Sequence, residues 1–396
     1  MTNSLPLAKS ALTDRQEVRV TTGADSTNSE WGSSASSSDT TLPKSNLIVK
    51  EYRDIPEWDS FVAEHPKGSI FHSAAMQRCE AIAKKREPFA IGALDSNGKL
   101  CAVLATVLVS TFSLISSQMT SRSVFYAEPI YLDTEDGYLG MVQLIRRHDE
   151  FMKSRTLFAE VRPLFVSSKA ETMSPLEACG YQRMGYLNYE LRLDSSEAEL
   201  FQRLSGKRRN NVRSTCRKGV TTIELDSPQG ISILYDLLRE SHSNSRIPLV
   251  HRSFLEAACR ELPQGSVRIL VAYHLGVPIA GGCFLSFKNR VICWYAGTKR
   301  LPGIAATSLV FWEAIKLYSS LGFEVFDLAG AGWEGEDYGP GKFKSKFGGE
   351  AIHSDRYRKI YAPIKMHLAE VLFKSFRQWI SPSASTGSMN QSIRSS

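Results

Sequence analysis

The sequence lacks the paired cysteines of a zinc site or of a disulfide framework. Its seven cysteines are scattered without a CxxC pair, at Cys79, Cys101, Cys179, Cys216, Cys259, Cys283 and Cys293. Such spacing is typical of small core side chains in a reducing compartment. His242 and His251 flank a loop, but no third ligand is spaced to complete a metal site with them, so we expect no metal.

Common catalytic signatures are also missing. The sequence contains no GxSxG elbow, HExxH helix, Walker loop or paired Rossmann glycines. Hydrolases, zinc proteases and nucleotide-driven motors therefore have little support. The net charge of +7 is modest for 396 residues and does not by itself indicate nucleic-acid binding. We expect no DNA partner.

A long apolar helix is missing as well. The uncharged run Leu100–Ser121 has the length of a membrane span, but it contains many serines and threonines and is rich in valine. Two successive buried strands explain it better. The N-terminus has no basic-then-apolar signal pattern. We expect a soluble, cytoplasmic protein with at most peripheral membrane contact.

What is present is enough apolar sequence for a large core, between two polar tails. Hydrophobic residues make up 42% of the chain. Residues 1–45 and 381–396 are rich in serine and other small polar residues and are predicted to be disordered. Between them we predict two domains, residues 46–194 and 195–380.

The two predicted domains follow the same order of helices and strands. Each contains two helices and then a hairpin, with turns at 96–98 and 275–277. The stretch NGKLCAVLATV resembles LGVPIAGGCFL, and ACGYQRM resembles SLGFEVF. The pattern predicts an α/β (α+β) protein with two related domains, each a sheet flanked by helices.

A strongly basic helix is predicted at 197–218. Arg209, Arg213 and Arg217 are four residues apart and share a face, beside Lys207. No acidic residue of the segment lies close enough to neutralise them, which favours binding of a polyanion over a solvated face. We take Arg209, Arg213 and Lys207 as candidate substrate-binding residues.

A short glycine-containing turn, Arg300 to Ala305 (RLPGIA), joins a predicted strand to a predicted helix. Amides at a helix N-terminus, freed by Gly303, can bind a pyrophosphate. A plain strand–helix turn explains the same residues equally well.

The most informative segment is 323–349, where a strand-like run breaks into glycines and then lysines. If the chain is extended there, Lys342, Lys344 and Lys346 share one face with phenylalanines on the other. That arrangement suits an anionic substrate, and it equally suits a solvated hairpin with a lysine-blunted edge. Candidate proton acceptors lie alongside, at Asp327, Glu334, Glu336 and Asp337. Tyr338 and the strand aromatics Trp294 and Tyr295 are candidates to line a pocket, although strand aromatics are usually core residues.

Several of these stretches resemble the GNAT superfamily, and specifically its FemAB-type branch of tandem-domain acyltransferases. They are FDLAGAG, the FKxxFGG pattern at Phe343–Gly349, the basic helix, and WDSFVAEHPKGSIFHS in the first half. The resemblance covers most of 46–375. It implies two tandem GNAT-like domains, each with a mixed, mostly antiparallel sheet, of which the second is catalytic and the first is a scaffold or binds the acceptor.

The resemblance also implies acyl transfer to an amine without a metal or a covalent enzyme intermediate. Phe343 and Lys344 match the family's Phe–Lys pair, in which the lysine stabilises the transferring acyl group. With Asp327 they are the candidate catalytic residues. Arg300, Gly303 and Ala305 fit the superfamily's pyrophosphate loop and are the candidate cofactor-binding residues.

The identity of the donor stays open between two cosubstrates. The helical hairpin with which some bridge-forming members engage tRNA is not evident, and the RLPGIA loop favours acyl-CoA. The leading expectation is an N-acyltransferase acting on a small-molecule or lipid-linked amine of a cell-envelope or sugar-linked precursor. A peptidoglycan-type transferase that uses aminoacyl-tRNA is the alternative. A non-catalytic RNA- or polyanion-binding protein is the alternative of another class.

Overall fold

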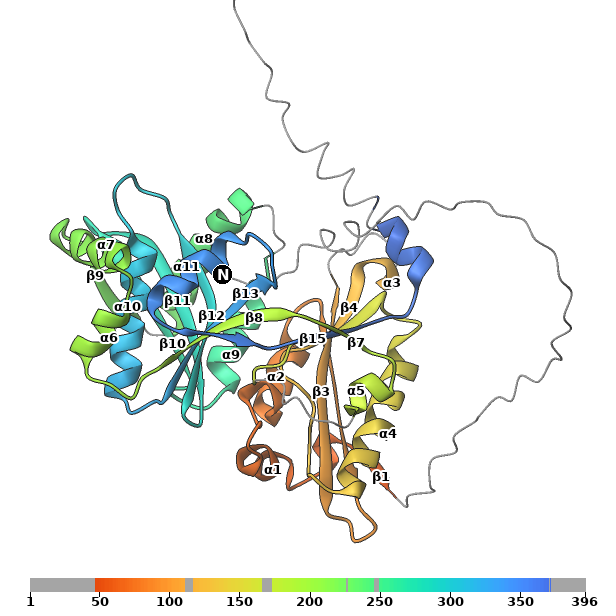
Figure 1. Ribbon diagram of the computed structural model, residues 1–396. Helices are drawn as coiled ribbons and strands as arrows, with labels where there is room; N and C mark the ends of the chain where they lie inside the picture. The colour runs from red at the N-terminus through yellow and green to blue at the C-terminus, as the bar shows by residue number, and fades with distance from the viewer. Residues whose placement is uncertain are drawn as a thin grey trace, which may run out of the picture.

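Two twisted sheets, each covered by helices, make up the computed structural model of this chain (Figure 1). The structure describes residues 47–110, 117–165, 173–225, 227–245, 249–369 and 371. The predicted tails, 1–45 and 381–396, lie outside these residues. Within the described part, no helix combines the length and the apolar character needed to cross a bilayer.

The first sheet has eight strands, and helices pack against it. Its strand order is β1 (Ile48–Glu51), β2 (Arg86–Leu94), β3 (Leu100–Ser110), β4 (Ser121–Phe125), β6 (Phe158–Val161), β15 (Arg356–Ile360) and β7 (Gln182–Met184), with β5 (Ile130–Tyr131) paired to β3. The associated helices are α1 (Trp58–Glu64), α2 (Ala74–Ile82), α3 (Ser117–Thr120), α4 (Glu135–Met152) and α5 (Pro175–Ala178). The predicted first hairpin is confirmed as β2–β3.

The second sheet has seven strands between two groups of helices. Its order is β14 (Glu350–His353), β8 (Tyr186–Arg192), β13 (Val325–Trp333), β12 (Arg290–Thr298), β11 (Val277–Phe287), β10 (Val267–His274) and β9 (Thr221–Leu225). The helices are α6 (Glu197–Arg203), α7 (Gly206–Arg217), α8 (Ser227–Ser245), α9 (Arg252–Glu261), α10 (Ala306–Ser320) and α11 (Gly339–Lys344). The mixed, mostly antiparallel pairing of both sheets confirms the predicted fold class.

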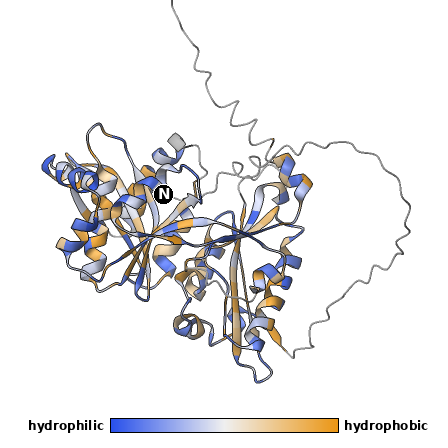
Figure 2. Cartoon of the chain, viewed as in Figure 1, coloured by the Kyte–Doolittle hydropathy of each residue, from blue (hydrophilic) through white to orange (hydrophobic). Residues whose placement is uncertain are grey.

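Hydrophobic residues gather on the strands and on the helix faces that cover them, and hydrophilic residues lie on the outer faces (Figure 2). In the second domain α10 covers one face with a core around Phe284, Phe311 and Phe326. The opposite face belongs to a core that continues into the first domain, because Met76 of α2 and Phe254 of α9 share it. The two domains are therefore joined by a common apolar core.

The two sheets also exchange strands. The strand β8, from the first half of the sequence, pairs with β13 and β14 of the second sheet. The strand β15, from the end of the described chain, pairs with β6 and β7 of the first sheet. Figure 1 shows both strands running between the domains. A division into consecutive residues 46–194 and 195–380 does not express this exchange.

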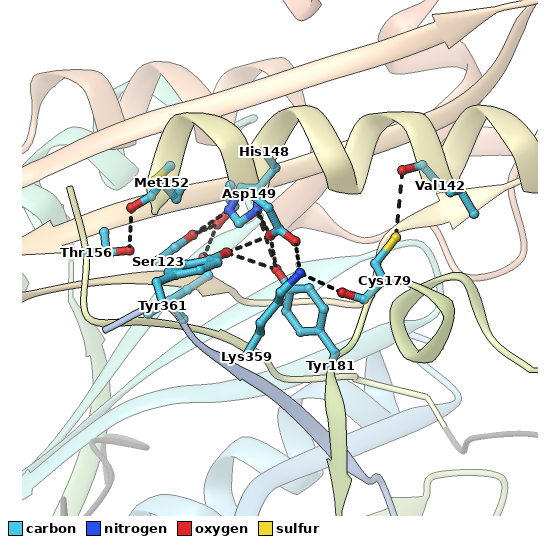
Figure 3. Close-up of polar contacts among 12 residues, drawn as sticks. Ser123, Val142, His148, Asp149, Met152, Thr156, Cys179, Tyr181, Lys359 and Tyr361 are labelled. Carbon is cyan, nitrogen blue, oxygen red and sulfur yellow. Dashed lines mark hydrogen bonds and ion pairs between the residues drawn. The ribbon is translucent and has the colours of Figure 1, made fainter. Parts of the chain in front are cut away.

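Asp149 of α4 anchors the exchanged strand β15 (Figure 3). Its carboxylate accepts hydrogen bonds from Lys359 Nζ at 2.7 Å, Tyr361 Oη at 2.6 Å and Tyr181 Oη at 2.8 Å. Burial opposes the charge on Asp149, but the hydrogen bonds outweigh it and lower the pKa of the carboxyl group. The C-terminal strand is thus held by a buried, charge-assisted network.

The same network contains a serine, a histidine and an aspartate whose side chains are linked one after another. His148 Nε2 lies 2.8 Å from Ser123 Oγ, and His148 Nδ1 lies 3.1 Å from Asp149 Oδ1. Ser123 and His148 are both 0% exposed, so no substrate reaches the hydroxyl. We assign this group a structural role.

Candidate active site

A cavity of about 260 Å³ lies between the domains, where strands β12 and β13 separate. The parallel pairing of these strands covers only three residue pairs and ends at Ile292 and Asp327. Beyond that point residues 292–295 of β12, together with Asp327, Ala329 and Gly330 of β13, line the cavity. Open backbone at strand ends is where sheets of this type bind ligands.

Asp327 is the buried carboxylate of this cavity. Its side chain is 0% exposed, and Oδ1 accepts a hydrogen bond of 2.7 Å from the backbone N–H of Ala329. Arg290 Nη1 lies 3.4 Å from Oδ2 but only 2.6 Å from Glu190 Oε1. Desolvation therefore dominates and raises the pKa of Asp327 to about 6. A carboxyl group with that pKa can accept a proton near neutral pH.

The backbone of β13 is irregular immediately after Asp327. Ala329 has φ 62°, a left-handed conformation that costs a non-glycine residue about 1–2 kcal/mol. The register against β8 shifts between Asp327 and Gly330 and again before Gly332. Such bulges redirect backbone groups beside functional sites.

Lys344 lies behind this irregular stretch, and the extended lysine edge predicted for 342–346 is wrong. These residues are helical, in α11 and the following 3-10 turn Ser345–Phe347. Lys344 is 1% exposed, whereas Lys342 and Lys346 are exposed. Lys342 pairs with Asp337 at 2.6 Å. In this helical conformation one of the three lysines is buried and the other two are exposed to solvent.

The ammonium of Lys344 donates one hydrogen bond, of 2.7 Å, to the carbonyl oxygen of Gly330. An ammonium has three donors, and no further hydrogen bond joins it to the described residues. Desolvation lowers the pKa of Lys344 to about 8, so it remains mostly protonated at neutral pH. Lys344 does not line the cavity directly, but Gly330, to which it is bonded, does.

Phe343 packs against the core of the second domain and does not line the cavity. Its ring lies against Phe311 and Phe347, with centroid distances of 5.5 and 5.2 Å. The guanidinium of Arg208 stacks over it at 4.1 Å and donates to its carbonyl oxygen at 3.2 Å. Phe343 therefore fixes the helix that presents Lys344, and does not reach the cavity.

Glycine allows α11 to approach β13 closely. A Cβ added to Gly341 would lie 2.2 Å from the carbonyl oxygen of Ala331. No side chain is compatible with that distance, so Gly341 sets how deeply the helix is seated. The position of Lys344 depends on this contact.

Four arginines line the cavity, and they were missed by the sequence reasoning. They are Arg86, Arg122, Arg162 and Arg356. Arg162 and Arg356 both bond to Glu160 Oε1, at 2.6 and 3.2 Å. The available signal was a charged pair, Glu160 and Arg162, in an otherwise apolar strand segment.

Of the candidate substrate-binding residues, Tyr295 lines the cavity and the others do not. Tyr338 is half-buried at the start of α11, with its ring against Gly332. The predicted single basic helix is two helices, because Ser205 caps α7 by accepting from the N–H of Arg208 at 3.3 Å.

The basic residues of α7 lie away from the cavity lining. Arg209 donates to the carbonyl oxygen of Gln202 at 2.8 Å, where α6 ends, while Lys207 is exposed. Arg213 lies over the ring of Phe201 at 5.0 Å, in an open groove that also contains Glu313. These residues therefore belong to a separate surface of the second domain.

The RLPGIA turn joins β12 to α10, as predicted. Two of its backbone groups are hydrogen-bonded to side chains at the C-terminal end of α7. Gly303 has φ 71°, and its carbonyl oxygen accepts a 2.6 Å hydrogen bond from Lys218 Nζ. The N–H of Ala305 donates to Thr215 Oγ1 at 3.1 Å. Arg300 is exposed. One of the amides that we expected to bind a pyrophosphate thus already has a partner.

Comparison with known proteins identifies the second domain by sequence. Residues 206–344 match the family model described as Acetyltransferase (GNAT) domain. The matched range begins with α7, includes β12 and β13, and ends at Lys344. No curated protein sequence matches the chain.

Solved structures extend the likeness over both domains. FemX is 12% identical, with a TM-score of 0.60 over 79% of this chain and 98% of FemX. A tandem GNAT protein from the clavulanic acid biosynthesis pathway is 11% identical, with a TM-score of 0.51 over 80% of this chain and 98% of that protein. L-PGS from Bacillus licheniformis is 14% identical, with a TM-score of 0.50 over 80% and 96%. The chain has the tandem GNAT fold that the sequence predicted.

Proposed function

We propose that the chain, which belongs to the FemAB-like branch of the GNAT superfamily, acylates an amine bound in the interdomain cavity. The observation that best supports this function is the buried Asp327 in the cavity lining, with the buried Lys344 bonded to the cavity-lining Gly330. Lys344 retains unused donors there, and the pKa of Asp327 suits a proton acceptor. Both groups are costly to bury, and such groups gather at functional sites.

The two side chains have complementary roles in acyl transfer. The amine attacks the acyl carbon, and the carbonyl oxygen becomes an oxyanion, whose charge the Lys344 ammonium stabilises from beside Gly330. Asp327 accepts the proton that the attacking nitrogen loses. The tetrahedral intermediate then collapses with loss of the donor's thiolate or ribose oxygen, which takes up a proton. No covalent enzyme intermediate is needed.

For the donor we propose an acyl-CoA. The turn between β12 and α10 offers Gly303 in a left-handed conformation, with the cations Lys218 and Arg300 beside it. A pyrophosphate is a suitable ligand for such a turn. The acceptor would enter from the first domain, whose arginines form the opposite wall of the cavity.

Aminoacyl-tRNA is the second candidate donor. It is favoured by the hydrogen bond from the Ala305 N–H to Thr215, which removes one amide from a pyrophosphate site. An aminoacyl ester needs no such site. In that case the function would be of the peptidoglycan-bridge type, with a cytoplasmic cell-envelope precursor as acceptor.

The two donors are separated by supplying each to the purified protein with a panel of amines. Product formation from acyl-CoA that is insensitive to ribonuclease supports the first proposal. Formation only from charged tRNA, abolished by ribonuclease, supports the second. No acylated amine from either donor, with a folded protein, would contradict both.

A further inference from the structure

The lining of the cavity between the domains is strongly cationic, although many of its residues are buried. Arg86 is neutralised by Glu80, with Nη2 2.8 Å from Oε1. Glu160, by contrast, is shared among three guanidinium groups, those of Arg162, Arg356 and Arg358. These neighbours offset its desolvation and lower the pKa of Glu160 to about 2. One carboxylate thus faces several cations, and a positive charge is left over.

Arg122 makes the excess clear, because Glu160, the carboxylate that acts on it, is already bonded to three other guanidinium groups. It lies on β4 and lines the cavity, and its Nε is buried without a hydrogen-bond partner. Among the described residues it forms no ion pair or hydrogen bond. Burial and the neighbouring Arg162 both lower the pKa of Arg122. A guanidinium whose Nε is buried without a partner is costly unless a ligand completes it.

A second arginine has a free donor in the same cavity. Arg162 is 8% exposed, and its Nη2 has no partner even though its Nε bonds to Glu160. Its guanidinium lies 5.5 Å from the ring centroid of Tyr126. Stacking of this kind holds a guanidinium in a fixed orientation before a ligand arrives. Two unsatisfied guanidinium groups are the arrangement that a carboxylate or phosphate satisfies.

The cavity volume of about 260 Å³ suits a small molecule or one headgroup. Asp327 lines the same cavity as Arg122 and Arg162. An amine placed near Asp327 and an anion placed at the arginines therefore lie in the same cavity, where one small molecule or one headgroup can carry both.

We propose that the acceptor carries its own anionic group, a carboxylate or a phosphate in the same molecule as the reacting amine, and that Arg122 and Arg162 bind this group. This inference rests on the proposed acyl transfer for the role of the amine. The anion-binding site itself is defined by the two arginines and does not depend on turnover. It makes the first domain the part of the protein that selects the acceptor.

The test is binding of three small amines that differ only in the attached group. O-phosphoethanolamine represents the phosphate, β-alanine the carboxylate, and ethanolamine the neutral amine, each titrated calorimetrically into the purified full chain. We expect one anionic probe to bind at least about tenfold more tightly than ethanolamine. Which of the two binds identifies the anion. Equal binding of all three, or binding of none, would overturn the proposal.

Variants locate the site and separate this proposal from the catalytic one. Arg122→Gln should lower the binding affinity for the anionic probe about 10- to 100-fold. Arg147→Gln, at an exposed arginine of α4, should leave this affinity unchanged. Lys344→Met should retain probe binding, so loss of acyl transfer alone leaves this inference standing. Arg122→Gln should also raise the unfolding temperature without ligand, because it removes an uncompensated charge. Unchanged probe binding by a folded Arg122→Gln protein would refute the assignment.

Discussion

Replacing Lys344 by methionine should make the protein more stable while it removes activity. Burial lowers the pKa of Lys344 from 10.5 to about 8, and each unit corresponds to about 1.4 kcal/mol. Burying the ammonium therefore costs about 3 kcal/mol relative to the neutral amine. The variant also loses the hydrogen bond to Gly330, worth about 1–2 kcal/mol with the carbonyl left unpaired. The net expectation at neutral pH is a gain of about 1–2 kcal/mol.

The pH dependence of this gain identifies its cause. The pKa of Lys344 is lower in the folded state, so the folded protein loses this proton at a lower pH than the unfolded chain does. The wild type therefore gains stability as pH rises from about 8 to about 10.5, and Lys344→Met lacks that gain. The advantage of the variant should shrink by up to about 3 kcal/mol across this range and reverse sign.

The assay is the free energy of unfolding in denaturant, measured from about pH 7 to about pH 10 for the wild type and Lys344→Met. Lys346→Met is the matched control, because Lys346 is exposed two residues away. Titrations common to all three proteins cancel in the differences. A difference between Lys344→Met and the wild type that does not change with pH would refute the argument that desolvation controls this lysine.

Three further outcomes follow from the geometry of the site and of its support. The value of kcat/KM should rise through about pH 6, as Asp327 loses its proton, and fall through about pH 8, as Lys344 loses its proton. Asp327→Asn should remove the rise at acid pH. A value of kcat/KM that does not change over this range would contradict the assignment. Gly341→Ala should lower both activity and thermal stability, because the added Cβ would lie 2.2 Å from a carbonyl oxygen. Gly339→Ala should change neither, because a Cβ there meets no atom within 4 Å. Equal effects in the two variants would show that the close packing of α11 on β13 is not the cause. Asp149→Ala should cost about 2–4 kcal/mol in denaturant unfolding because it releases β15, and a cost below about 0.5 kcal/mol would contradict the anchoring role.

The elements that the sequence predicted well are those whose pattern is local. The hairpin β2–β3 has a polar turn between apolar strands, and α10 is a long, mostly apolar run of helical length. Lys344 was singled out through a family motif. Local periodicity and motif were sufficient in these places because tertiary contacts reinforce them.

Other features depend on contacts between distant residues, and the sequence did not reveal them. The lysines of 342–346 alternate as they would in a strand, but Phe343 and Phe347 are four apart and pack together on one helical face against Phe311. That spacing was the overlooked signal for a helix. Arg122 gave no signal, because the residues that line the cavity with it are distant from it in the sequence.

The central claim is that the protein transfers an acyl group at the interdomain cavity and that the Lys344 ammonium stabilises the oxyanion. Its most direct test is mass-spectrometric detection of acylated amine, formed by the wild type, Lys344→Met and Lys346→Met under the same donor and amine conditions. We predict that the wild type and Lys346→Met form product at equal rates, and that Lys344→Met is slower by at least about 100-fold while folded. Product formation by Lys344→Met at the rate of the wild type would contradict the account.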